Sequence, residues 1–175
     1  DDGFLGKGTI TVSKMAVSGP SLCAVPDEGM IYMDRRLTWG ETSELAVEQV
    51  KKAIAEAGVE GAVVRVPDYD KPSYKGVVHA QDLYFPTWKL PADHPLVRAG
   101  VAAHSGLFGA DPAVDKWTFS TNCVAVAGRH KIPCIGFGPG DEAQAHAPNE
   151  ITRVADLEKC AAFYAALPYA LEGLV

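Results

Sequence analysis

One histidine in an irregular loop is the residue best suited to chemistry in this sequence. His146 lies in the stretch GFGPGDEAQAHAPNE, residues 136–150, where five residues are glycine or proline. The apolar run Ile132–Phe137 leads into this stretch. If that run is a buried strand, His146 lies near the C-terminal edge of a sheet, where open α/β sheets hold their sites. A neutral imidazole is a good metal ligand, and Glu150 is near enough in sequence to fix its tautomer. A lone histidine in a loop is nevertheless more often a surface residue.

The cysteines offer a second candidate chemistry. His130 and Cys134 are four residues apart and could form a nucleophilic Cys–His pair. Cys134 lies inside an apolar run, however, where a thiol is inert. The remaining cysteines, Cys23, Cys123 and Cys160, are scattered, and the sequence has no C-x-x-C pair. This pattern favours four reduced thiols in a cytoplasmic protein.

Length and composition exclude several classes of protein. The chain has 175 residues, enough for one large domain or two small ones. Its apolar fraction of 47% and charged fraction of 22% are ordinary for a globular protein. The net charge of −6 and the lack of a basic run argue against a nucleic-acid partner. No segment approaches the roughly 20 apolar residues that span a bilayer, so we expect no membrane association.

The elements that must position these residues can be predicted from periodicity. In the N-terminal part, alternation and β-branched residues predict three strands, and a 3–4 spacing of apolar residues predicts one helix. These are strands over Gly8–Val17, Met30–Leu37 and Gly61–Val66, and a helix from Thr42 or Ser43 to Ala57. The order β-β-α-β indicates an α+β unit with an antiparallel sheet.

The C-terminal part reads differently, after a connection rich in proline and tyrosine over Pro67–Pro91. Pro95 suits the first turn of a helix. The expected elements are a helix over Pro95–Phe108, a short strand over Trp117–Ser120, a helical turn over Val124–Arg129, a buried strand over Ile132–Phe137 and a closing helix over Asp156–Leu167.

Four stretches carry a resemblance to a known family. They are PSLCAVPDEGMIYMDRRLTWGET, YFPTWKLPADHPLV, DKWTFSTNCVAVAGRHKIPCIGFGPG and AHAPNE, in the family's order. Together they resemble the C-terminal half of the zinc-dependent peptidase/aminoacylase family. That family includes acetylornithine deacetylase, succinyl-diaminopimelate desuccinylase and glutamate carboxypeptidases. The nearest likeness is to the branch of selenium-metabolism-linked hydrolases.

The resemblance implies an α/β fold in two parts. Residues 1–70 are similar to an α+β lid and dimerisation domain without its first strand and helix. Residues 71–78 would be a linker, and residues 79–175 the C-terminal part of a zinc-peptidase-like catalytic domain. The expected partners are a second copy bound through the lid, or an N-terminal companion fragment that supplies the missing elements.

The resemblance also implies roles for individual residues. His146 falls on the family's C-terminal metal ligand, for zinc or for cobalt or manganese, with two ions in the intact enzyme. Arg36 falls on a lid arginine that grips a substrate carboxylate, for which a planar guanidinium is suited; it could equally be a solvated charge. Thr121 and Asn122 fall on a substrate-lining turn, although they could simply cap a helix. Glu150 would support the His146 loop.

The departures from the family are as informative as the matches. The family's other metal ligands and its general base come from a His-x-Asp motif and a Glu-Glu pair, and this sequence has neither. We therefore expect the general base upstream and no catalytic residue within these 175 residues. Cys123 stands where the nearest branch has glycine, and Cys23 where some relatives have asparagine. One histidine cannot hold two ions.

These implications lead to two functional hypotheses. The first is the C-terminal portion of a hydrolase in which a metal-bound hydroxide attacks the amide carbonyl of a small N-acyl amino acid, dipeptide or similar substrate. The isolated chain is then expected to be inactive. The alternative is a catalytically inactive dimerisation or interaction module derived from the same family.

Overall fold

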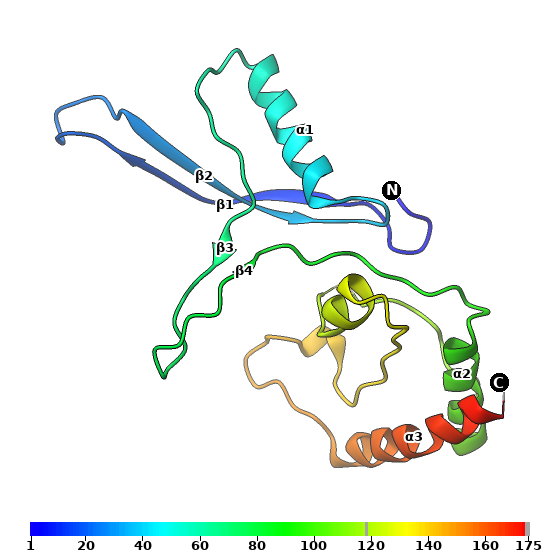
Figure 1. The fold of residues 1–175 in the computed structure, drawn as a ribbon. Coiled ribbons are helices and arrows are strands. Elements are labelled where there is room, and N and C mark those ends of the chain that lie inside the picture. The colour runs from blue at the N-terminus through cyan, green and yellow to red at the C-terminus, as the bar shows by residue number, and fades with distance from the viewer. Residues whose placement is uncertain (118, 174–175) are drawn as a thin grey trace. The chain divides into compact units, whose positions relative to one another are not determined.

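Helices and short open sheets alternate along the chain, which confirms the predicted α/β class (Figure 1). The computed structural model describes residues 1–117 and 119–173. The chain divides into two compact units, Asp1–Thr87 and Trp88–Val175, called unit 1 and unit 2 below. The assignment of residues 1–70 to a lid, 71–78 to a linker and 79–175 to a catalytic part stays a prediction. No helix within the described ranges is long and apolar enough to cross a membrane.

Unit 1 is built on a long antiparallel hairpin of β1 (Thr9–Ser18) and β2 (Glu28–Arg36). Both strands were predicted, because β-branched residues alternate along them. The register runs from Thr9 opposite Arg36 to Ser18 opposite Glu28, with one irregularity between Val12 and Lys14. Most of the hairpin side chains are exposed, on both faces.

Helix α1 (Ser43–Glu56) follows the hairpin and agrees with the predicted helix. The Thr42 side chain caps it by accepting a hydrogen bond from the Leu45 backbone N–H at 3.3 Å. Beyond the helix, Gly58 adopts a left-handed φ of 68°, a conformation that suits glycine after a helix end. Start and stop signals in the sequence therefore determine this element.

A polar network ties the end of β2 to α1. The Arg35 guanidinium donates to Gln49 of α1 and to Glu41 in the intervening loop, each at 2.7 Å. Glu41 also accepts from the Thr38 backbone N–H at 2.9 Å, and the buried Thr38 hydroxyl donates to the Gly6 carbonyl at 2.6 Å. The Thr38 N–H and Arg35 hold the pKa of Glu41 below its ordinary value, since both favour the ionised form.

The predicted strand over Gly61–Val66 is wrong, because these residues are irregular. Two residues further on, β3 (Asp68–Tyr69) pairs antiparallel with β4 (Gln81–Asp82) in a separate two-residue ribbon. A β-branched run forms a strand only when another strand completes its hydrogen-bond ladder. The element order in unit 1 is β-β-α-β-β, in which the third strand lies after the predicted residues and pairs with β4 rather than with the hairpin.

Unit 2 contains the apolar core, between helices α2 (Pro95–Phe108) and α3 (Val154–Glu172). Pro95 occupies the first turn of α2 and Gly109 ends the helix with a φ of 73°, as their residue types favour. Small residues line the buried face of α2, and Cys160 and Phe163 face it from α3. A methyl group on Gly100 would lie 2.8 Å from Ile135 Cδ1, so the packing there is close.

Helix α3 is longer than the predicted Asp156–Leu167. It begins at Val154 and continues through Pro168 to Glu172. Proline in a helix interior removes one hydrogen bond, which is the reason the sequence predicts an end there. Packing of α3 against α2 overrides this local preference.

The predicted buried strand over Ile132–Phe137 is also wrong, since this run is irregular. The Tyr164 hydroxyl from α3 accepts from the Phe137 N–H at 3.0 Å and donates to the Phe137 carbonyl at 2.8 Å. A side chain thus supplies hydrogen bonds that a neighbouring strand would otherwise provide.

The short strand expected over Trp117–Ser120 falls partly on Thr118, outside the described residues; the other residues of this segment are not in a strand. The helical turn over Val124–Arg129 is confirmed as a short π-helix.

Candidate functional site

His146 lies in a loop whose two ends meet. Gly140 and Thr152 form an isolated antiparallel bridge that closes residues 141–151 into one loop. Within it, Asp141 caps a 3₁₀ turn over Glu142–Gln144, its side chain accepting from the Ala143 N–H at 3.0 Å. The loop is therefore ordered by its own backbone and side-chain contacts, as compact surface loops commonly are.

His146 itself is exposed and has a left-handed φ of 63°. Its backbone N–H donates to Glu150 Oε2 at 3.1 Å. Asn149, one residue before that carboxylate, also has a positive φ of 64°. Glu150 thus fixes the backbone at His146, while its predicted influence on the imidazole stays a prediction. The backbone conformation costs energy that the loop contacts must offset.

The described residues do not complete a metal centre around His146. No group of three or more His, Cys, Asp and Glu side chains in residues 1–117 and 119–173 is arranged to hold a metal ion. A two-metal hydrolytic site needs a bridging carboxylate and several further ligands. These residues alone therefore do not fit two bound ions, and we derive no chemical step through a metal in this chain.

Thr121 and Asn122 form the turn that starts the π-helix over Val124–Arg129. The Thr121 hydroxyl accepts from the Cys123 N–H at 3.2 Å, and its carbonyl from the Val124 N–H at 3.0 Å. The Asn122 carbonyl accepts from the Ala125 N–H at 3.0 Å. These contacts are those of a helix cap. The Asn122 residue is exposed, so capping and contact with a substrate are compatible.

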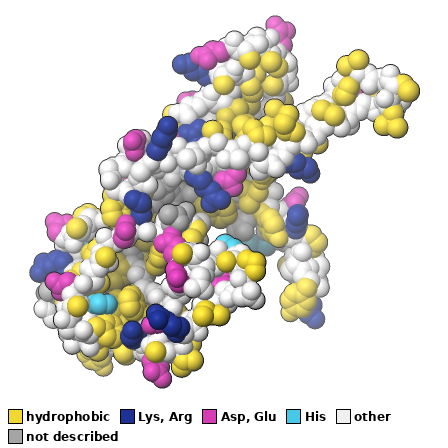
Figure 2. Space-filling model, turned by 180° about the vertical axis from the view of Figure 1, so that it is seen from behind, with side chains coloured by type: hydrophobic (Ala, Val, Ile, Leu, Met, Phe, Trp, Pro, Cys, Tyr) yellow, Lys and Arg dark blue, Asp and Glu magenta, His cyan; other side chains and the backbone are white. Residues whose placement is uncertain are grey.

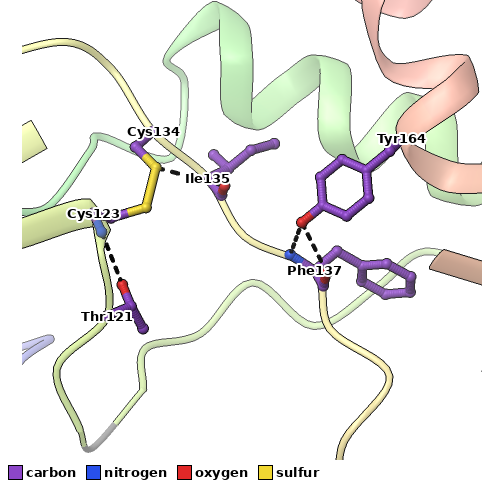
Figure 3. The surroundings of a disulfide bond; sticks show 6 residues. All are labelled: Thr121, Cys123, Cys134, Ile135, Phe137 and Tyr164. Atoms are coloured by element: carbon purple, nitrogen blue, oxygen red, sulfur yellow. Dashed lines mark hydrogen bonds between the residues drawn. A yellow bond between two sulfur atoms is a disulfide. The ribbon is translucent and has the colours of Figure 1, made fainter. Parts of the chain in front are cut away.

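A disulfide bond joins Cys123 to Cys134, with their Cα atoms 6.4 Å apart (Figure 3). The expectation of four reduced thiols is therefore wrong for this pair, while Cys23 and Cys160 are free. The hypothesis of a nucleophilic Cys134 paired with His130 also fails for this state, because the sulfur is already bonded. The two cysteines are eleven residues apart with no motif between them, so only the three-dimensional structure shows the pairing.

Arg36, the predicted carboxylate-binding residue, lies at the end of β2 in unit 1. Its Nε contacts Asp34 Oδ1 at 2.8 Å, and its side chain is 64% exposed. The neighbouring Arg35, which sequence reasoning did not single out, is half-buried and paired with Glu41. Successive residues of a strand point to opposite faces, so only one of two adjacent arginines can reach α1. The sequence signal that could have distinguished Arg35 from Arg36 is Glu41, the acidic residue in the loop before α1.

Unit 2 has an open cavity of about 580 Å³ beside the base of the His146 loop. It is lined by His104, Phe108, Phe137, Gly138, Pro139, Gly140, Arg153, Asp156, Lys159 and Cys160. Arg153 and Lys159 donate to Asp156 at 2.7 and 3.4 Å and hold the pKa of that carboxyl below its ordinary value. Burial raises the pKa of the Cys160 thiol, which keeps it protonated and inert.

Comparison with known families decides which proteins share this arrangement. The model of Peptidase family M20/M25/M40 matches residues 28–170, most of the chain. The chain belongs to this family. The resemblance is thereby confirmed at the level of this peptidase family, while the dependence on zinc and the narrower branch stay predictions.

Curated relatives of this M20-family chain are longer than the chain itself. The uncharacterized protein YgeY of Escherichia coli strain K12 is 54% identical over 167 residues, which are 95% of this chain and 41% of that protein. YgeY of Escherichia coli O157:H7 matches with the same values. The chain thus spans less than half the length of these relatives.

A solved structure supports the M20 fold. The crystal structure of the M20 family metallo-carboxypeptidase Sso-CP2 from Sulfolobus solfataricus superposes with a TM-score of 0.55 at 19% identity. The match covers 96% of this chain and 35% of that one. At this level of identity the likeness concerns the fold.

Proposed function

We propose that this chain is the C-terminal portion of a metal-dependent hydrolase that cleaves an amide bond. Small N-acyl amino acids, dipeptides and similar compounds are the proposed substrates. The single observation that carries the proposal is the match of residues 28–170 to a peptidase family. Within that family, the quoted motifs favour the branch of selenium-metabolism-linked hydrolases. A cytoplasmic location is part of the same proposal.

His146 is the proposed metal ligand of this chain, with zinc as the expected ion and cobalt or manganese as substitutes. The backbone of His146 is fixed by the hydrogen bond to Glu150, and its exposed side chain is accessible to a metal ion. Divalent ions held by such ligands polarise carbonyl groups and activate water. We propose that the remaining ligands and the general base come from outside residues 1–175, because the described residues gather no further ligand cluster.

Arg36, Thr121 and Asn122 are the proposed substrate contacts. A guanidinium with an exposed side chain can exchange its Asp34 partner for a substrate carboxylate at low cost, since exposed ion pairs are weak. The exposed Asn122 offers an amide that can donate and accept hydrogen bonds at once. The Arg36 guanidinium suits a substrate carboxylate, and the Asn122 side chain suits a substrate amide.

One observation favours the alternative of an inactive interaction module. Hydrophobic side chains are exposed toward the projecting end of the β1–β2 hairpin, including Met15, Val17, Leu22 and Val25 (Figure 2). Exposed strand edges and apolar patches favour pairing with another chain. The proposed partners are a second copy through residues 1–70 or an N-terminal companion fragment. Light scattering with mass spectrometry would show a complex, whereas a monodisperse monomer would contradict this partner proposal.

Metal content and turnover separate the two hypotheses. The isolated chain with zinc or cobalt should not hydrolyse a panel of N-acyl amino acids above background. In the full-length protein, His146→Ala should lower metal content and turnover at least about tenfold, whereas the control His130→Ala, another exposed histidine of unit 2, should not. If the full-length protein binds no metal and has no turnover, the hydrolase proposal is wrong.

A further inference from the structure

The Cys123–Cys134 bond connects two segments that carry proposed site residues. Cys123 directly follows Asn122, and its backbone N–H donates to the Thr121 hydroxyl (Figure 3). Cys134 stands in the irregular run that continues through Gly138 into the closed loop of His146. One covalent bond thus joins the turn of Thr121 and Asn122 to the segment that leads to the proposed metal ligand.

The other contacts around this bond are mostly local. The Ile132 N–H donates to the Val126 carbonyl at 3.0 Å, and both residues lie inside the ring that the disulfide closes. The Val126 N–H in turn donates to the Asn122 carbonyl at 3.4 Å, so hydrogen bonds link the turn to the π-helix, whereas the disulfide is its covalent link to the run of Cys134. Further along, the Tyr164 hydroxyl fixes the run at Phe137. Opening the disulfide therefore leaves the far end of the run in place and removes the covalent link between this run and the turn.

The two sulfur atoms are also in positions where reduction is feasible. Both cysteines are half-buried, in contrast to the buried Cys160. The Cys134 sulfur lies 3.7 Å from the Ile135 carbonyl oxygen, which can accept a weak hydrogen bond from the thiol once it forms. Disulfides of proteins in reducing compartments are commonly transient and redox-sensing.

We propose that the Cys123–Cys134 bond is a thiol–disulfide exchange site, at which a dithiol reductant controls the position of the Thr121–Asn122 turn relative to the His146 loop. This inference rests on the proposed function for the roles of Thr121, Asn122 and His146. It goes beyond that function by making the substrate turn responsive to the redox state.

The exchange balances in two steps. A thiolate of the reductant attacks one sulfur atom, forms a mixed disulfide and displaces the other cysteine as a thiolate. The second thiol of the reductant then attacks the mixed disulfide and releases the first cysteine. The reductant becomes a disulfide, and Cys123 and Cys134 together gain two electrons and two protons.

Thiol counting tests whether the bond forms. The chain is purified without reductant, unfolded in denaturant, alkylated with iodoacetamide and measured by intact-mass spectrometry. We expect Cys23 and Cys160 to be alkylated, and all four cysteines to be alkylated when the folded protein is first treated with dithiothreitol. Four alkylated cysteines without reductant would overturn the proposal, as would resistance of the folded protein to dithiothreitol.

Amide hydrogen exchange tests whether the bond controls the turn. On reduction, amides of residues 122–126 should exchange about tenfold faster, while those of α1 should not change. The variants Cys123→Ser and Cys134→Ser should reproduce the reduced pattern, and Cys23→Ser should match the oxidised wild type. Unchanged exchange at residues 122–126 after confirmed reduction would overturn the proposal. Neither readout requires turnover, so either test can fail while the proposed hydrolase function stands.

Discussion

Unit 1 and unit 2 are each stabilised internally by a different kind of interaction. Among the described residues, unit 1 buries only Thr38, which is polar. Unit 2 buries apolar side chains from α2, α3 and the π-helix, namely Val97, Ala99, Ala103, Ala127, Cys160 and Phe163. Unit 1 therefore depends on its hairpin ladder and the Arg35–Glu41 network, and unit 2 on packing. Removing apolar atoms should destabilise unit 2, whereas removing charges or caps should destabilise unit 1.

Phe163 in the core of unit 2 should give the largest effect. It is 3% exposed and packs with the ring of Phe137, the two centroids being 4.5 Å apart. Phe163→Ala should lower the free energy of unfolding of unit 2 by about 3–5 kcal/mol, because it leaves a cavity. Urea unfolding followed by circular dichroism measures the loss. The control Tyr169→Ala, on the same helix but 76% exposed, should cost much less. Equal losses would mean that unit 2 has no packed core at Phe163.

Gly136 tests the effect of adding a side-chain atom to tightly packed residues, the opposite of creating a cavity. A methyl group added there would collide with the Trp117 ring. Gly136→Ala should cost about 1–3 kcal/mol, since the indole must move as a rigid group. Gly138→Ala is a matched control, because nothing lies within 4 Å of the added methyl group. Thermal unfolding of the two variants should separate them by several degrees; identical midpoints would show that Trp117 does not pack on this glycine.

Glu41 tests the polar support of unit 1. Its side chain is 19% exposed and accepts from both Arg35 and the Thr38 backbone. Glu41→Gln should destabilise unit 1 by about 1–2 kcal/mol, because it weakens charge-assisted hydrogen bonds. Faster amide exchange in β2 and α1 is the expected readout. The exposed Glu48 of α1 provides the control Glu48→Gln, which should have little effect.

The same carboxylate predicts a pH dependence. The folded pKa of Glu41 lies below its ordinary value of 4.5, so the unfolded state binds the proton more readily. The stabilisation is therefore fully present above that ordinary value and is lost as the pH falls through the folded pKa. The protection factors of β2 amides, which correct for the intrinsic pH dependence of exchange, should fall in the wild type on acidification and should be less pH-dependent in Glu41→Gln. Parallel profiles would contradict the role given to this network.

The cap of α1 should give the smallest effect. The exposed Thr42 hydroxyl accepts a hydrogen bond from the Leu45 N–H at 3.3 Å. Thr42→Ala should cost about 1 kcal/mol, whereas Thr42→Ser keeps the accepting oxygen and should be nearly neutral. Amide exchange in the first turn of α1 measures the difference. Unit 2 should be unaffected by either substitution, and a change there would weaken the comparison between the two units.

The elements that the sequence predicts well are those defined by local signals. Proline at the start of α2, glycine at its end and the Thr42 cap of α1 act within a few residues of the backbone they control. Two predicted strands are wrong, over Gly61–Val66 and Ile132–Phe137. Apolar and β-branched residues indicate that a segment can form a strand, but they do not show whether another strand lies beside it to complete the hydrogen-bond ladder. For Ile132–Phe137, Tyr164 occupies hydrogen-bonding groups that a ladder would use.

The candidate site likewise has features that the sequence predicts and features that only the structure shows. The type and setting of His146 made it a candidate, and the structure adds the closed loop and the Glu150 contact. Its role as a ligand, like the roles of Arg36, Thr121 and Asn122, stays a prediction. The disulfide could not be predicted, because it depends on the distance between two segments in space. Arg35 was overlooked since the choice between adjacent arginines depends on which face of β2 the helix covers.

The bridge between Gly140 and Thr152 also has a consequence for evolution. Because the loop closes on itself, insertions and substitutions between these two residues need not displace α3 or the packed helices, and the entropy cost of a longer closed loop grows only slowly with its length. Descendants of a common ancestor can therefore diverge in length and charge ahead of the histidine while the scaffold is retained. Among homologous proteins, we expect sequence variation in this loop to concentrate in residues 141–144, before the AHAPNE stretch, with helix-facing positions of α2 and α3 changing much more slowly.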